Sequence, residues 1–194
     1  MQKTSRQHGL TLIELVVFMV VISIGLAGIL GALNLTTRNS ANPMLLKQQL
    51  AIAESLLEEI ESKPFTWCDP DDANVTMASG AFVGAGGCAA TTQLLSLSPT
   101  AGESRDSQTV PFDNVADFGG LNMNAGILNP SSGAVISGLG SYTATVTLTP
   151  VGDIAPTNVG AADAVLKIDV KVSMTGQADL TLTGYRYRYA PNVP

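Results

Sequence analysis

One carboxylate stands within the longest apolar stretch of this 194-residue chain. Between Arg6 and Arg38 the only formally charged side chain is Glu14, with His8 taken as neutral. A carboxylate near the start of a membrane-spanning helix is costly, because the bilayer cannot solvate its charge, and such residues usually serve a function. Glu14 is therefore the first candidate functional residue.

Two later segments, Trp67–Asn74 and Pro111–Gly120, carry further carboxylates. Calcium takes six to eight oxygen ligands from groups of this kind. The first segment lacks the spacing of a calcium loop, and Pro70 is awkward within one. We therefore interpret the carboxylates as caps of turns in an acidic surface and predict no metal and no cofactor, with calcium as the alternative. The calcium candidates are Asp69, Asp71, Asp72, Asp113 and Asp117.

The cysteines and the histidine limit the chemistry. Cys68 and Cys88 are the only cysteines, and in an exported domain two cysteines most simply form one disulfide. Closing a loop of about 20 residues contributes roughly 3 kcal/mol on the chain-entropy model. Two free buried thiols are the alternative. His8 is the only histidine, so the globular part lacks the commonest general base, and we predict no catalytic residues and no enzyme.

The apolar run Leu15–Leu33 is long enough to cross a bilayer as a helix. Lys3 and Arg6 precede it and no basic residue follows before Arg38, which predicts a cytoplasmic N-terminus and an exported C-terminal part. An ordinary signal peptide, cut among the small residues at 27–31, is one alternative. A plain single-pass anchor is another.

Residues Gly9 to Leu15 read GLTLIEL, which resembles the class III signal of type IV prepilins and type II secretion pseudopilins. The resemblance implies cleavage after Gly9 and N-methylation of Leu10, where most relatives have Phe. Glu14 then falls at the fifth position of the mature chain and pairs with the methylated terminal amine of a neighbouring subunit. The physics agrees, because a buried carboxylate without a partner is strongly destabilising. Pairing between subunits would enforce register during assembly.

Trp67–Asn74 and Pro111–Gly120 both resemble segments of the MshD-type minor pilins of the mannose-sensitive haemagglutinin (MSHA) pilus. This resemblance implies a minor pilin that primes or enters a filament. Its partners would be other major and minor pilins, the prepilin peptidase, the inner-membrane assembly platform and, before assembly, membrane lipid. A pseudopilin of a type II secretion system is one alternative, and a tip adhesin that binds a surface ligand through residues 64–140 is another. The formal charge of −6 argues against nucleic acid.

These features predict an α+β, pilin-like fold with a long N-terminal helix packed on a C-terminal antiparallel meander. Pro64 ends the helix. Asn42 and Pro43 indicate a break and a new helix start. The expected organisation is a leader (1–9), a membrane and filament-core helix (10–37) and a globular domain (38–194) with an amphipathic helix (44–63), a loop-rich region (64–140) and a sheet (141–190). The apolar helix positions are Leu45, Leu46, Leu50, Ile52, Ala53, Leu56, Leu57 and Ile60.

Apolar and polar residues alternate over Tyr142–Leu148 and Leu166–Met174, which predicts two half-buried strands, with a third over Asp179–Tyr189. The third strand changes parity around Gly184, and a bulge there would let its leucines and its tyrosines both face the core. Without a bulge, Arg186 and Arg188 would point inward. A cation–aromatic ligand site is the functional alternative.

Overall fold

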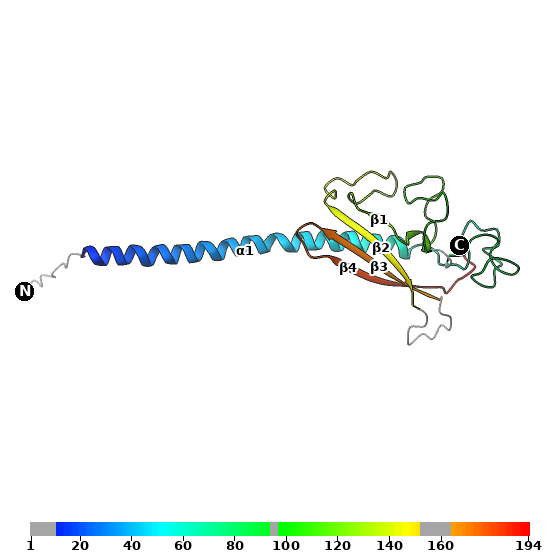
Figure 1. Ribbon diagram of the computed structural model, residues 1–194, viewed down its shortest axis with the longest axis horizontal. Coiled ribbons are helices and arrows are strands. Elements are labelled where there is room, and N and C mark those ends of the chain that lie inside the picture. The colour runs from blue at the N-terminus through cyan, green and yellow to red at the C-terminus, as the bar shows by residue number, and fades with distance from the viewer. Residues whose placement is uncertain (1–10, 94–96, 152–163) are drawn as a thin grey trace, which may run out of the picture. The chain divides into compact units, whose positions relative to one another are not determined.

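The computed structural model describes residues 11–93, 97–151 and 164–194, with the side chains of 34–42 left out. The chain divides into two compact units, Met1–Met44 and Leu45–Pro194. The elements are α1 (Leu12–Glu61), the short 3₁₀ helix η1 (Ala116–Phe118), β1 (Asn122–Met123), β2 (Tyr142–Pro150), β3 (Val165–Met174) and β4 (Leu180–Tyr187) (Figure 1). The predicted α+β class, a long helix followed by an antiparallel sheet, is confirmed.

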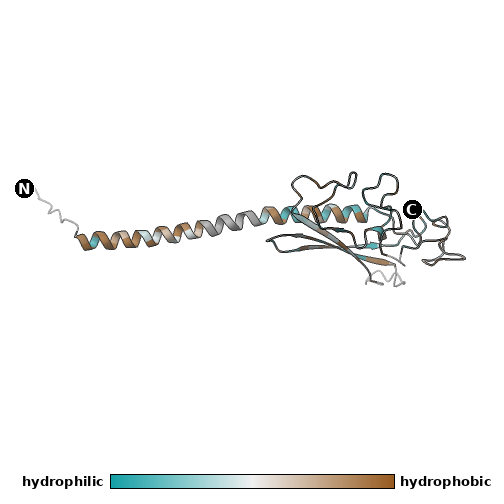
Figure 2. Cartoon of the chain, turned by 45° about the horizontal axis from the view of Figure 1, so that its top comes forward, coloured by the Kyte–Doolittle hydropathy of each residue, from teal (hydrophilic) through white to brown (hydrophobic). Residues whose placement is uncertain are grey.

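Within the first unit, residues 15–33 of α1 are apolar on every face except at Ser23. Leu12–Leu33 is long and apolar enough to cross a membrane, and none of it is buried inside the protein. Figure 2 shows this part of α1 mostly in the hydrophobic colour. A helix that buries no face within its own chain needs an apolar environment from outside, either lipid or other helices.

The predicted break before Pro43 is wrong, because the backbone is helical through Pro43 and α1 is one element. A proline inside a helix removes one hydrogen bond and costs about 3 kcal/mol. Strong helical segments on both sides can carry that local cost. The helix ends at Glu61. Just beyond it, the Lys63 N–H donates to the Ile60 carbonyl at 3.1 Å.

The second unit is built on a four-stranded antiparallel sheet in the order β1-β2-β3-β4. The three predicted strands are present, and the Gly176 turn joins β3 to β4 with Gln177 N–H on the Met174 carbonyl at 3.1 Å. β1 was not predicted, because two residues give no period-two pattern. It pairs with the start of β2, which extends the meander by one edge strand.

The C-terminal part of α1 covers one face of this sheet. Ile52, Ala53, Leu56 and Ile60 are buried with the inward residues of β2 and β3 in one core. The first two turns of this part of α1 differ from the predicted set of apolar, buried positions. Leu46 and Leu50 are 50% and 36% exposed, whereas Gln49 is buried in their place.

A hydrogen bond explains why Gln49 is buried at this position instead of a leucine. The Gln49 amide donates to the Ala178 carbonyl at 3.2 Å, in the connection between β3 and β4. The buried amide group of Gln49 thus has an acceptor, and a leucine there could not form this hydrogen bond.

The predicted bulge in β4 is also wrong. Pairing between β3 and β4 is continuous from Val172 with Leu180 to Val165 with Tyr187. Gly184 serves a different purpose, because a Cβ there would lie 2.8 Å from a methyl of Leu57. The glycine lets α1 approach the sheet closely.

Without a bulge, both arginines of this segment face inward and the tyrosines on the other parity face solvent. Arg186 donates to the Lys63 carbonyl at 2.9 Å, and Arg188 stacks over the Phe65 ring at 4.1 Å. Tyr185 and Tyr189 are 45% and 77% exposed. The two arginines therefore fasten the end of the sheet to the segment that follows α1.

Candidate functional site

The cleavage and methylation residues, Gly9 and Leu10, lie outside the described residues. Glu14 lies in the first turn of α1, and its backbone N–H donates to the Thr11 hydroxyl oxygen at 3.4 Å. Thr11 thus caps the helix, and Thr11-x-x-Glu14 matches the capping-box pattern that the sequence already contained. A negative charge is also favourable at a helix N-terminus. The Glu14 side chain is exposed, so it is accessible to a cationic partner.

Cys68 and Cys88 form the predicted disulfide, with their Cα atoms 5.4 Å apart. Both are fully buried and form a second, small core with Val75 and Ala78, against which Trp67 packs. The bond fixes the turn that follows Cys68, in which three of the predicted carboxylates lie.

Asp72 is a turn cap, as the sequence indicated. Its carboxylate accepts the backbone N–H groups of Ala89, Ala90 and Thr91 at 2.8–3.0 Å, and of Asn74 at 2.9 Å. Burial opposes the charge, but these four donors outweigh it and lower the pKa of Asp72 to about 2. Asp72 therefore belongs to the disulfide loop and takes no part in the cluster described next.

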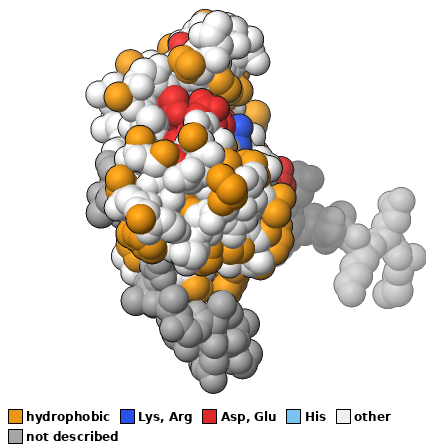
Figure 3. All heavy atoms as spheres, turned by 90° about the vertical axis from the view of Figure 1, so that its right-hand side faces the viewer, with side chains coloured by type: hydrophobic (Ala, Val, Ile, Leu, Met, Phe, Trp, Pro, Cys, Tyr) orange, Lys and Arg blue, Asp and Glu red, His pale blue; other side chains and the backbone are white. Residues whose placement is uncertain are grey.

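Four other carboxylates meet in a single group. Oxygens of Asp69, Asp71, Glu103 and Asp113 all lie within 4.8 Å of one another. Figure 3 shows Asp and Glu side chains gathered in one patch on this face. Two unit charges at such a separation repel by about 3 kcal/mol at an effective dielectric constant of 20. Glu103 was missed, because it lies outside both acidic segments, more than 30 residues after Asp71 and about ten before Asp113.

Hydrogen bonds from neighbouring loops hold this cluster in place. Asp69 accepts from the Thr100 hydroxyl at 2.8 Å and from the Asn114 amide at 3.3 Å. Asp117, which is buried, accepts the backbone N–H groups of Asp113 and Asn114 at 3.1 and 3.0 Å. The capped-turn interpretation is thus confirmed for Asp117, and the caps place the Asp113 carboxylate next to that of Asp69.

The cluster has raised pKa values. Burial, together with the charges of Asp117 and Asp69, raises the pKa of Glu103 to about 8. Burial and the Asp69 charge raise the pKa of Asp113 to about 6, and burial also raises that of Asp117. The ion pairs among the described residues all lie elsewhere: Arg105 with Glu59, Lys167 with Asp169, and Lys171 with Asp179.

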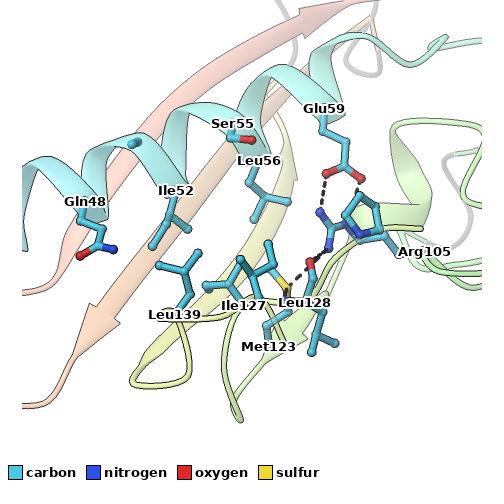
Figure 4. A pocket seen from close by; sticks show the side chains of 13 residues that line it. Gln48, Ile52, Ser55, Leu56, Glu59, Arg105, Met123, Ile127, Leu128 and Leu139 are labelled. Atoms are coloured by element: carbon cyan, nitrogen blue, oxygen red, sulfur yellow. Dashed lines mark hydrogen bonds and ion pairs between the residues drawn. The ribbon is translucent and has the colours of Figure 1, made fainter. Parts of the chain in front are cut away.

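A separate cavity of about 360 Å³ lies between α1 and the loops around β1 (Figure 4). Its lining is mainly apolar, with Ile52 and Leu139 facing each other in the view. Arg105 closes one end by a bidentate pair with Glu59 and a 2.8 Å bond to the Leu128 carbonyl. Because these two charges satisfy each other, the cavity offers little to orient a polar ligand.

Residues 4–30 match the family model of the prokaryotic N-terminal methylation motif. No curated protein and no solved structure matches the chain. The motif is that of type IV prepilin-like proteins and supports membership of the pilin and pseudopilin family. It implies a structural protein that a prepilin peptidase processes and that assembles with other pilins. With the apolar helix, it indicates a membrane anchor before assembly.

Proposed function

We propose that the protein is a minor pilin of an MSHA-type type IV pilus, processed after Gly9 and incorporated into a filament or its priming complex. The methylation motif over residues 4–30 is the observation that carries this proposal. The resemblance of Trp67–Asn74 and Pro111–Gly120 to MshD-type minor pilins favours this pilus type. The protein is stored as a single-pass inner-membrane protein with its N-terminus in the cytoplasm.

In this proposal α1 changes its surroundings while keeping its own conformation. Before assembly lipid covers Leu12–Leu33, none of which is buried within the chain. In the filament other pilin helices replace the lipid, and Glu14 pairs with the methylated Leu10 amine of a neighbour. Leu46 and Leu50 in the second unit are also exposed and offer further apolar side chains to neighbouring subunits.

N-terminal sequencing of the mature protein tests the processing step. The expected first residue is N-methylated Leu10, and Gly9→Val should leave full-length precursor in the membrane, because the peptidase would lose its small residue. A mature chain that starts at 27–31 would show an ordinary signal peptide and overturn the proposal.

Deletion of the gene separates a pilus from a secretion pseudopilus. A minor pilin is needed for surface filaments, so its loss should reduce sheared filaments while protein secretion continues, and the wild-type gene should restore them. Normal filaments with a secretion defect would instead support the pseudopilin. A tip adhesin predicts a third result: normal filaments and secretion, with loss of surface attachment.

A further inference from the structure

The sheet ends at β4 in an unpaired edge. β4 pairs with β3 on one side, and it is the last strand in the order β1-β2-β3-β4 (Figure 1). The Arg188 N–H donates to the Ala164 carbonyl at 2.9 Å, which continues the register of the β3–β4 pair. In an antiparallel pair, alternate residues point their backbone groups to the partner strand. The even-numbered residues of β4 therefore bond to β3, and the N–H and C=O groups of Thr181, Thr183 and Tyr185 point to the open edge.

This edge lacks the usual protection against further pairing. Sheets guard an edge with a bulge, a proline, a lysine or a very short strand. β4 has eight residues in continuous register, and the stretch 180–185 contains no proline and no charged side chain. The two lysines on neighbouring β3 are paired. Lys167 pairs with Asp169 at 2.7 Å, and Lys171 pairs with Asp179 at 2.6 Å. The edge is thus a regular, nearly neutral strip on an acidic protein.

An apolar stripe of α1 lies on the same side of the molecule as this edge. Leu57 lies against β4 at Gly184, and Leu50 shares its stripe two turns earlier in the helix. Leu50 is 36% exposed, and Leu180 and Leu182 of β4 are only partly buried against the core. A strand added beside β4 would place every second side chain next to these leucines and bury them further. The geometry therefore suits an extended segment with alternating apolar residues.

We propose that the open edge of β4 binds an extended segment of a neighbouring filament subunit as a fifth strand of the sheet. Main-chain hydrogen bonds to Thr181, Thr183 and Tyr185 supply the affinity, and apolar contacts to Leu50 and the leucines of β4 supply the selectivity. The segment is uncharged where it faces this neutral edge. The inference rests on the proposed function, because it takes the partner from the filament.

A second copy joined edge to edge through β4 fits less well. Two identical edges that keep α1 on the same sheet face can pair only around a two-fold axis, which also sets their α1 helices antiparallel. Subunits of one filament run in one direction, and contacts between different surfaces of neighbours generate helical filaments. The formal charge of −6 on each chain adds repulsion between copies. The contact therefore joins β4 to a different surface of the neighbouring subunit.

Thr183→Pro tests the edge. The Thr183 N–H points to the open edge, so proline removes an edge donor and leaves the hydrogen bonds between β3 and β4 in place. Thr183→Val is the matched control: both variants lose the 2.6 Å hydrogen bond that the hydroxyl donates to Asp169, but valine keeps the N–H. The ratio of filament-associated to membrane-associated mature protein should fall about tenfold in Thr183→Pro and stay at the wild-type value in Thr183→Val.

Two further measurements separate pairing from folding. In detergent the two variants should have Tm values within about 3 °C of each other. In the unaltered chain, the amides of Thr181, Thr183 and Tyr185 should exchange hydrogen at least about tenfold more slowly in sheared filaments than in detergent, whereas the Leu182 amide is protected in both. If proline lowers Tm further, this exchange measurement decides.

The outcomes are distinct. A wild-type ratio in a folded Thr183→Pro variant, or edge amides that stay unprotected in filaments, would overturn the fifth strand. A dimer in detergent that Thr183→Pro abolishes would assign the edge to a second copy and also overturn the proposal. Absence of the wild-type protein from filaments would instead refute the proposed function, and this inference with it.

Discussion

Two regions of this protein leave opposite kinds of surface uncompensated. At the N-terminal end, Leu12–Leu33 forms a helix whose apolar side chains are all exposed. In the loop region of the second unit, carboxylates are crowded and partly buried without a basic partner among the described residues. Uncovered apolar surface calls for lipid or protein, whereas crowded carboxylates favour the uptake of a proton or a cation, as the raised pKa values of Glu103 and Asp113 show.

The two regions also differ in how the sequence specifies them. The N-terminal function is carried by neighbouring residues, and its only charge, Glu14, is already positioned by the first helical turn. The acidic cluster exists only because the disulfide and the turn caps bring distant loops together. Damage to the fold of residues 45–194 should therefore destroy the second region while sparing processing of the first.

Loss of the disulfide should have the largest effect on stability. The double variant Cys68→Ser, Cys88→Ser should lose about 3 kcal/mol, which corresponds to a Tm about 6–12 °C lower. Cleavage after Gly9 and membrane insertion should persist, because they depend on the first region. Thermal unfolding of the detergent-solubilised chain measures this change. The wild type in reductant serves as the control, and an unchanged Tm in both samples would contradict the expectation.

Gly119→Ala should cost about 2 kcal/mol. Gly119 has an ordinary φ of −64°, so the cost is steric: an added Cβ would overlap the backbone carbonyl of Leu97. Gly140→Ala is the matched control, because its Cβ would meet only a Val135 methyl at 3.9 Å. Chemical denaturation of both variants decides the point, and equal stabilities would show that the loop of Leu97 yields freely.

Asp72→Asn should have a smaller effect, about 1–2 kcal/mol. An amide keeps the shape but turns an NH₂ group toward backbone donors that now bond to a carboxylate. The exposed neighbour Asp71 provides the comparison, since Asp71→Asn should cost nothing. Denaturant unfolding of the two variants checks this difference. A greater loss in Asp71→Asn would reverse the roles given to the two carboxylates.

The fold was largely predictable because its signals are local. Period-two alternation located β2, β3 and β4, and the apolar run located the first part of α1. Predictions failed where a contact between residues distant in the sequence determines which side chain is buried or how closely two elements pack. Gln49 replaces Leu50 in the core because a carbonyl of the β3–β4 connection lies above it. β4 needs no bulge at Gly184, because the missing side chain leaves room for α1 to pack against the sheet there.

The candidate site was predictable in part for the same reason. The disulfide and the cap at Asp72 followed from residue type and context, and both are present. Thr11 was missed although the capping-box pattern marks it. Glu103 carried no sequence signal, because a single glutamate in a loop becomes part of a cluster only through tertiary folding.

The most direct test of the account is the incorporation of a Glu14→Gln variant into filaments. Glutamine keeps the shape and suits the capping position beside Thr11, so the helix start should survive while the charge is lost. Glu54→Gln, which removes an exposed charge from the later part of α1, is the matched control.

The measured quantity is the ratio of filament-associated to membrane-associated mature protein for each variant. Glu14→Gln should lower this ratio about tenfold or more, the effect of losing a pairing worth about 1.4 kcal/mol or above, while processing and the Glu54→Gln ratio stay at wild-type values. A wild-type ratio for Glu14→Gln would contradict the claim that this carboxylate docks the subunit into the filament.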